Sequence, residues 1–178
     1  MSMNRIAGAF GAAAFACLST SAFAHITLET EQAAVKSTYK AVLRVPHGCE
    51  GAPTLKVRVQ IPDGVIAVKP MPKPGWTVET VKAPFKQPVD YYGEPLTEGV
   101  KEISWTGKLL DEHYDEFVFR AYLSDGLKSD PALYFPTVQE CEGGKVERWI
   151  EIPAAGKSAD DYKNPAPGLK LIPATKTQ

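Results

Sequence analysis

The sequence predicts an all-β fold, an antiparallel β-sandwich, and three observations support this prediction. Residues 55–61 alternate strictly between apolar and polar side chains, which is typical of a strand with one buried face. Short runs of β-forming residues recur along the chain, separated by turn sequences such as Pro62-Asp63-Gly64. No long stretch repeats its apolar side chains with the 3.6-residue period of a helix. Short strands at this spacing favour a sandwich of the immunoglobulin or fibronectin kind, with a barrel as the alternative.

The expected strands follow one another from residue 35 to residue 152. The first, residues 35–45, is rich in Val, Leu, Thr and Tyr and ends before Pro46. Those after residues 55–61 are residues 65–68, 76–81, 100–105, 116–123, 133–138 and 145–152. The 15 prolines lie mostly between these runs, where a missing N–H removes no ladder hydrogen bond.

The first 24 residues are predicted to be a signal peptide that is removed on export. Arg5 gives a positive start, residues 6–18 form an apolar run, and Ala22-Phe23-Ala24 places small residues where a signal peptidase needs them. The run is shorter than the ~20 apolar residues that cross a bilayer. Cys17 suggests a lipoprotein, but Leu is absent three residues before it. We therefore expect a soluble periplasmic protein whose mature form begins at His25.

The mature chain is expected to form one domain, residues 25–153, followed by a tail. The tail, residues 154–178, is rich in Ala, Gly, Lys and Pro and is expected to be mostly irregular. The net charge of −1, with both signs interspersed, gives no reason to expect a nucleic acid or an anionic membrane as partner. The sequence contains no nucleophile elbow, phosphate loop or HExxH motif.

Cleavage would remove Cys17 and leave two cysteines, Cys49 and Cys141. In an oxidising compartment an even pair is most simply a disulfide. The alternative is a pair of thiolate ligands for a soft metal, although the two residues form no CxxC motif.

A free N-terminal histidine at residue 25 has metal-binding chemistry that the precursor lacks. Its α-amine and its ring Nδ1 can bind one ion and close a six-membered ring. The amine has an ordinary pKa of ~8, so it loses its proton readily to a metal near neutral pH. Nitrogen and oxygen donors in a tetragonal arrangement favour Cu(II). The alternative is an accident, because almost any residue can follow a cleavage site.

Several short segments extend this observation. They are His25-Ile26-Thr27-Leu28, Arg44-Val45-Pro46, Glu50 with residues 53–57, residues 61–65, residues 72–76, Ile103-Ser104-Trp105 and Val146-Glu147-Arg148-Trp149. In this order and spacing, residues 25–153 resemble the YcnI-type copper-binding domain family. The resemblance implies an immunoglobulin-like sandwich with one Cu(II) ion in a monohistidine brace. The implied ligands are His25 and Glu50, with Trp149 beside the metal, or Trp105 or Trp76 in its place.

The sequence departs from the simplest pattern of that family around Glu50. A Cys49–Cys141 disulfide would tie the Glu50 loop to the strand that bears Trp149. His47, three residues before Glu50, is either an additional metal ligand or a solvated loop residue.

His113 lies in the acidic segment 111–116, which is either a solvated turn or a further metal-binding position.

The function implied is that of an exported Cu(II)-binding protein, a copper chaperone or sequestration factor in copper homeostasis, and not an enzyme. Its partners would be other periplasmic copper carriers or a membrane copper transporter. One alternative is a copper-dependent redox enzyme of the histidine-brace type, if His47 or His113 completes the brace. The other is a structural or adhesive sandwich without a metal.

Overall fold

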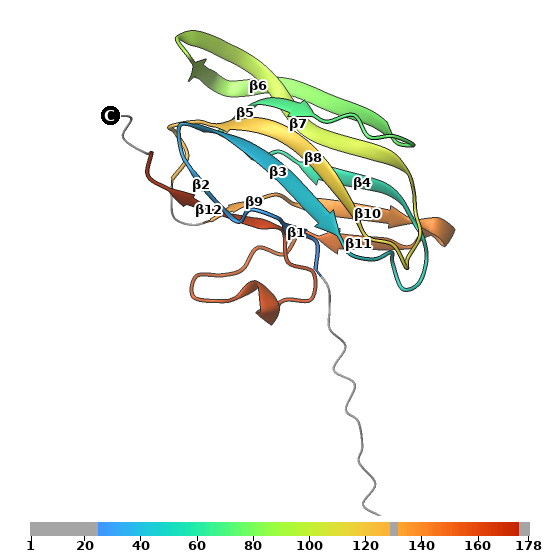
Figure 1. Ribbon diagram of the computed structural model, residues 1–178. Helices are drawn as coiled ribbons and strands as arrows, with labels where there is room; N and C mark the ends of the chain where they lie inside the picture. The colour runs from blue at the N-terminus through green and yellow to red at the C-terminus, as the bar shows by residue number, and fades with distance from the viewer. Residues whose placement is uncertain (1–24, 129–131, 175–178) are drawn as a thin grey trace, which may run out of the picture.

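The computed structural model describes residues 25–128 and 132–174 of the chain (Figure 1). The expected signal peptide, residues 1–24, lies outside the described residues. In the described part of the chain, no helix is long and apolar enough to cross a membrane.

Two antiparallel sheets face each other, and a small third sheet closes one side. The first has the strand order β1 (Thr27–Leu28), β3 (Ser37–Val45), β8 (Asp115–Leu123), β5 (Val65–Pro70). The second has the order β11 (Val146–Trp149), β10 (Thr137–Cys141), β4 (Thr54–Gln60), β7 (Glu94–Leu109), β6 (Thr77–Tyr91). The third joins β2 (Gln32–Ala34), β12 (Gly168–Ile172) and β9 (Leu133–Tyr134). The predicted immunoglobulin-like sandwich is confirmed.

The core lies between the two large sheets. In β4 the alternation read from the sequence points Val57 and Val59 inward, where both are fully buried. Trp105 of β7 meets Phe117 of β8 across the interior, with ring centroids 5.5 Å apart. Burial of these apolar surfaces is the main force that holds the two sheets together.

The domain extends beyond the limit expected at residue 153, because β12 belongs to it. Leu169 and Leu171 alternate inward from β12 and are buried in the core. β12 pairs in parallel with β2 and antiparallel with β9, so both of its edges are hydrogen-bonded. The expected irregular tail is therefore wrong for Gly168–Ile172. The intervening residues 153–167 are mostly irregular, as expected, with one short 3-10 helix, η2 (Ala159–Asp161).

The β6–β7 hairpin is longer than the sequence predicted and curves along the upper edge of the molecule in Figure 1. Its tip turns at Tyr92 and Gly93, which both have positive φ. Next to the tip, the ring of Tyr91 packs on the ring of Tyr122 in β8, with the two centroids 5.3 Å apart. Pro84 and Pro88 lie within β6, which is tolerated because β6 is an edge strand.

Candidate functional site

His25 lies beside Trp149 at one edge of the sandwich. Its ring centroid is 5.9 Å from that of the indole, with a tilt of 59° between the planes. The two residues that follow hold this position: Ile26 is buried, and β1 begins at Thr27 and pairs with β3. β1 and β11 belong to different sheets. His25, which leads into β1, therefore meets Trp149 of β11 only when the two sheets have packed together.

Of the three tryptophans considered from the sequence, Trp149 is the one in contact with His25. Its side chain is 3% exposed, and its Nε1–H donates to Oε1 of Gln139 at 3.1 Å. Trp105 and Trp76 instead pack on Phe117, at centroid distances of 5.5 and 4.8 Å. The indole of Trp149 is therefore held in a fixed orientation at the edge where the histidine lies.

Glu50 occupies the tip of a tight loop. Cys49 and Ala52 exchange both backbone hydrogen bonds, each 3.0 Å long, and the two residues between them have positive φ. Lys145 Nζ donates to the Glu50 carbonyl at 2.9 Å and lies 3.7 Å from Oε2 of its carboxylate. The Glu50 side chain is 76% exposed, so its carboxylate can turn without breaking a buried contact.

Gly48 allows the chain to enter this loop. A Cβ at this position would lie 2.0 Å from the carbonyl oxygen of Ala52, which no side chain tolerates. Its N–H donates to Oδ1 of Asp111 at 2.9 Å, which attaches the loop to the turn before β8.

The predicted Cys49–Cys141 disulfide is present, with the two Cα atoms 6.0 Å apart. Both cysteines are buried. The bridge joins the Glu50 loop to β10, and β10 is hydrogen-bonded to β11, where Trp149 lies opposite Thr137. The expected disulfide is confirmed, but it ties the loop to β10, the neighbour of the strand that bears Trp149, and not to that strand itself.

His47 lies close to the same indole, with ring centroids 6.4 Å apart. Its Nδ1 is 2.6 Å from the carbonyl oxygen of Gly48. Because a carbonyl can only accept, Nδ1 carries the proton, and in the neutral ring Nε2 then carries the lone pair. A ligating histidine commonly has its other ring nitrogen held in this way.

His47, Glu50 and Trp149 line one cavity of about 330 Å3. The other residues that line it are Gly51, Asp111, Glu147, Lys163 and Asn164. His25 reaches this group through its contact with Trp149. Within residues 25–128 and 132–174, no three His, Cys, Asp or Glu side chains lie close enough together to hold a metal ion by themselves.

His113 lies apart from this cluster, in the exposed turn before β8. Its side chain is 59% exposed, and its Nε2 is 3.8 Å from Oε1 of Glu112. The carboxylates around it have structural partners of their own: Asp111 accepts from Gly48, and Asp115 pairs with Lys73. This arrangement favours the interpretation of residues 111–116 as a solvated turn.

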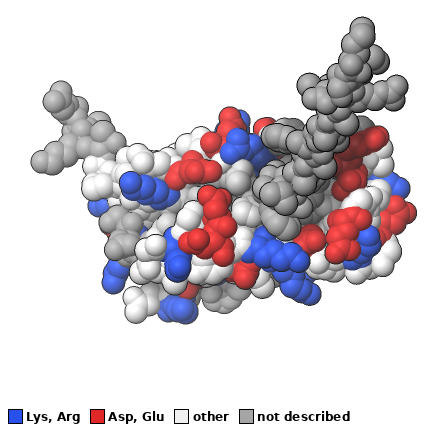
Figure 2. Space-filling model, turned by 90° about the horizontal axis from the view of Figure 1, so that it is seen from below, with Lys and Arg blue, Asp and Glu red and all other residues white. Residues whose placement is uncertain are grey.

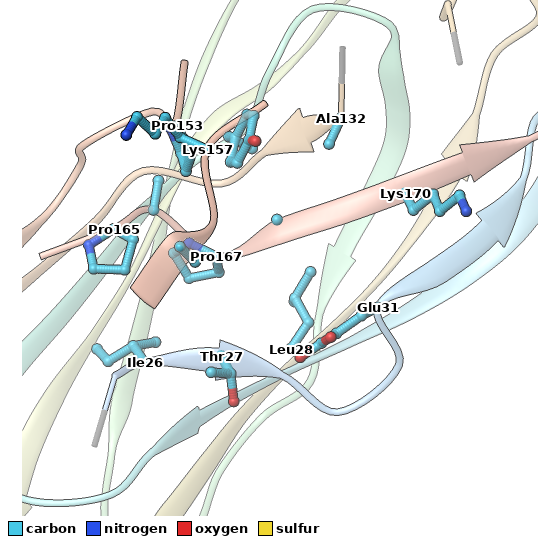
Figure 3. Close-up of a pocket in the computed structure, with 14 residues that line it drawn as sticks. Ile26, Thr27, Leu28, Glu31, Ala132, Pro153, Lys157, Pro165, Pro167 and Lys170 are labelled. Carbon is cyan, nitrogen blue, oxygen red and sulfur yellow. The ribbon is translucent and has the colours of Figure 1, made fainter. Parts of the chain in front are cut away.

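A second hollow, of about 270 Å3, lies between β1 and the segment that leads into β12 (Figure 3). Its walls are mainly Ile26, Leu28, Pro153, Pro165 and Pro167. No imidazole or thiol is among the described residues that line it. On the face seen in Figure 2, acidic and basic side chains are interspersed, in agreement with the net charge.

Sequence reasoning missed Gln139, which is fully buried between Trp149 and the Glu50 loop. A signal for it exists in the alternation of β10, where Thr137, Gln139 and Cys141 all point inward. An amide in a row of inward-facing positions calls for buried hydrogen-bond partners, but the sequence does not name them.

The fold and this cluster define an immunoglobulin-like β-sandwich with a histidine at the start of the domain, packed on a tryptophan beside a disulfide-tethered glutamate loop. The chain belongs to a family described as a domain of unknown function (DUF1775), whose model matches residues 25–171. This is the YcnI-like domain, so the resemblance seen in the sequence is confirmed.

A solved structure with similar architecture is an uncharacterized protein from Nocardia farcinica, described as having an immunoglobulin-like fold. It is 24% identical, with a TM-score of 0.61, and the match covers 83% of this chain and 97% of that chain. This likeness establishes the fold. No curated protein matches the chain.

Proposed function

We propose that the mature protein binds one Cu(II) ion through His25 and Glu50, beside Trp149, and acts as an exported copper chaperone or sequestration factor. The observation that supports this most directly is the meeting of two donors at one indole: His25 packs on Trp149, and Glu50 lines the same cavity as Trp149.

The donor set fits the ion chemically. An imidazole nitrogen, a carboxylate oxygen and an α-amine are ligands that suit Cu(II). The amine arises only when cleavage before His25 frees it, so the uncleaved chain lacks one of the ligands. The exposed carboxylate of Glu50 supplies a negative charge, and the indole of Trp149 shields one side of the site from water.

His47 is proposed as an additional ligand. Its ring lies near the same indole, and its Nδ1 is held by the Gly48 carbonyl, as the second ring nitrogen of a ligating histidine often is. Copper would reach and leave this site through periplasmic copper carriers or a membrane copper transporter.

The proposal is tested by Cu(II) titration of the protein that starts at His25, followed by electron paramagnetic resonance. One equivalent bound, with a tetragonal signal showing nitrogen hyperfine structure, is expected. His25→Ala should abolish this signal and Glu50→Ala should alter it, whereas His113→Ala, a matched exposed histidine, should leave it unchanged. A protein that retains no copper would instead be a metal-free structural or adhesive sandwich.

The second candidate is a copper-dependent redox enzyme of the histidine-brace type. It is favoured by one observation, the second imidazole of His47 near Trp149. Reductant-dependent cleavage of a polysaccharide, lost in both His25→Ala and His47→Ala, would support this candidate against the chaperone.

A further inference from the structure

Gln139 is a buried amide whose hydrogen-bonding groups are all used. It lies on β10 with an exposure of 0%. Its Oε1 accepts from Trp149 Nε1 at 3.1 Å. Its Nε2 donates to the His47 carbonyl at 2.7 Å and to Thr54 Oγ1 at 2.6 Å. One planar group therefore joins the indole of β11, the chain entering the Glu50 loop and strand β4.

The disulfide lies against the main chain of Gln139 and against Thr54, one of the partners of the amide. Thr54 Oγ1 is 3.8 Å from Cys141 Sγ, and the backbone carbonyl oxygen of Gln139 is 3.8 Å from Cys49 Sγ. The disulfide fixes the distance between the Glu50 loop and the sheet. The Gln139 amide holds the Trp149 indole and the His47 backbone in their orientations.

The pattern of donors and acceptors calls for a side chain that can both donate and accept hydrogen bonds, as the glutamine amide does. The indole can only donate and the His47 carbonyl can only accept, so the linking group must offer both functions. An ionised glutamate of the same shape would accept from Trp149 but could not donate to His47. A methionine of similar volume could not donate to His47, and its thioether sulfur is only a weak acceptor for the Trp149 indole.

We propose that Gln139 is a positioning residue that sets the orientation of the Trp149 indole and the placement of His47, and thereby the geometry of the metal site. The part of this inference that concerns the metal rests on the proposed function. The part that concerns Trp149 and His47 does not.

The test uses the mature protein with Gln139→Met, Gln139→Glu and the control Gln60→Met, an exposed glutamine of the same sheet. In the metal-free protein, NMR should show the Trp149 indole N–H exchanging at least tenfold faster in Gln139→Met. In Gln139→Glu this proton should stay protected while the His47 ring resonances shift. The Trp105 indole, buried in the core, should be unchanged in every variant.

With Cu(II), Gln139→Met should bind at least tenfold more weakly and give a changed paramagnetic resonance spectrum, whereas Gln60→Met should match the wild type. Unchanged indole exchange in Gln139→Met would overturn the positioning role, whether or not copper binds. Faster exchange with unaltered affinity and spectrum would overturn its part in the metal site. Failure of the wild-type protein to retain copper would overturn the proposed function, and the exchange data would still decide the positioning role. If Gln139→Met does not fold, unshifted His47 resonances in Gln139→Glu would overturn the inference.

Discussion

The imidazole of His25 lies 5.9 Å, centroid to centroid, from the indole of Trp149, although His25 leads into β1 of one large sheet and Trp149 belongs to β11 of the other. Neither strand alone can create this contact. It depends on the pairing of β1 with β3 and of β11 with β10, and on the packing of the two sheets. The candidate site is therefore a property of the assembled sandwich.

A protein that keeps one extra residue before His25 should lose tight Cu(II) binding and remain folded. The α-amine would then become a peptide amide, whose nitrogen is a far poorer ligand. Isothermal titration, with circular dichroism to confirm the fold, measures both properties. Equal affinity with and without the extra residue would place the copper elsewhere.

The Cys49–Cys141 bridge should contribute substantially to stability. It spans 92 residues of sequence. On a chain-entropy model, a loop of this length stabilises the fold by about 4–5 kcal/mol, less any strain. Urea denaturation of the double variant Cys49→Ala/Cys141→Ala should show most of this loss. Thiol titration of the unfolded, unreduced protein that starts at His25 should find no free thiol, and two free thiols would contradict the structure.

Gly48→Ala should destabilise the protein by about 1–3 kcal/mol, because the new Cβ would overlap the Ala52 carbonyl and force the Glu50 loop to move. Gly126→Ala is the matched control, since a Cβ there meets its nearest neighbour at an ordinary 3.9 Å. Thermal unfolding measures both. A Gly48→Ala protein as stable as the control would show that the loop is not tightly enclosed.

Leu169→Ala should destabilise the domain by about 2–5 kcal/mol, because it leaves a cavity where β12 enters the core. Lys170→Ala, on the exposed face of the same strand, should have little effect. Denaturant unfolding compares the two. Equal stability of both variants would restore residue 153 as the end of the folded domain.

Asp63 should make the stability depend on pH at low pH. Hydrogen bonds from Lys101 and Lys86 lower the pKa of its carboxyl below the ordinary 3.8. The folded state thus favours the ionised form, and this stabilisation is present above pH 3.8 and lost as the pH falls through the lower folded pKa. Because the carboxylate is exposed, the effect should stay within about 1 kcal/mol. The melting temperatures of wild type and Asp63→Asn should differ at pH 7 and converge near pH 2. A difference that stays constant with pH would show that it does not come from ionisation of Asp63.

The sequence predicted the strands that bury one regular face, because period-2 alternation reports burial directly. Val57 and Val59 in β4 are examples. It missed β12, a strand of five residues among prolines and lysines whose partners are two even shorter strands. It also missed the outer half of the β6–β7 hairpin, where Pro84 and Pro88 suppress the strand signal although an edge strand accepts them.

The candidate site was predicted less completely than the fold. Counting cysteines was sufficient to predict the disulfide, the cleavage site pointed to His25, and Glu50 followed from a resemblance. The contacts that orient Trp149 could not be predicted, because the partners of Gln139 lie on three other chain segments brought together only by tertiary packing.

The prolines of β6 also affect the tendency of this protein to aggregate with other copies of itself. β6 is the terminal strand of its sheet and is 15 residues long, so its outer rim offers a row of backbone groups to any passing strand. Pro84 and Pro88 remove two donors from that strand, and its register slips between Pro84 and Val89. An irregular rim of this kind is a poor template for edge-to-edge aggregation. The same two prolines that weakened the strand signal in the sequence therefore disfavour the addition of further strands to the edge of this sheet.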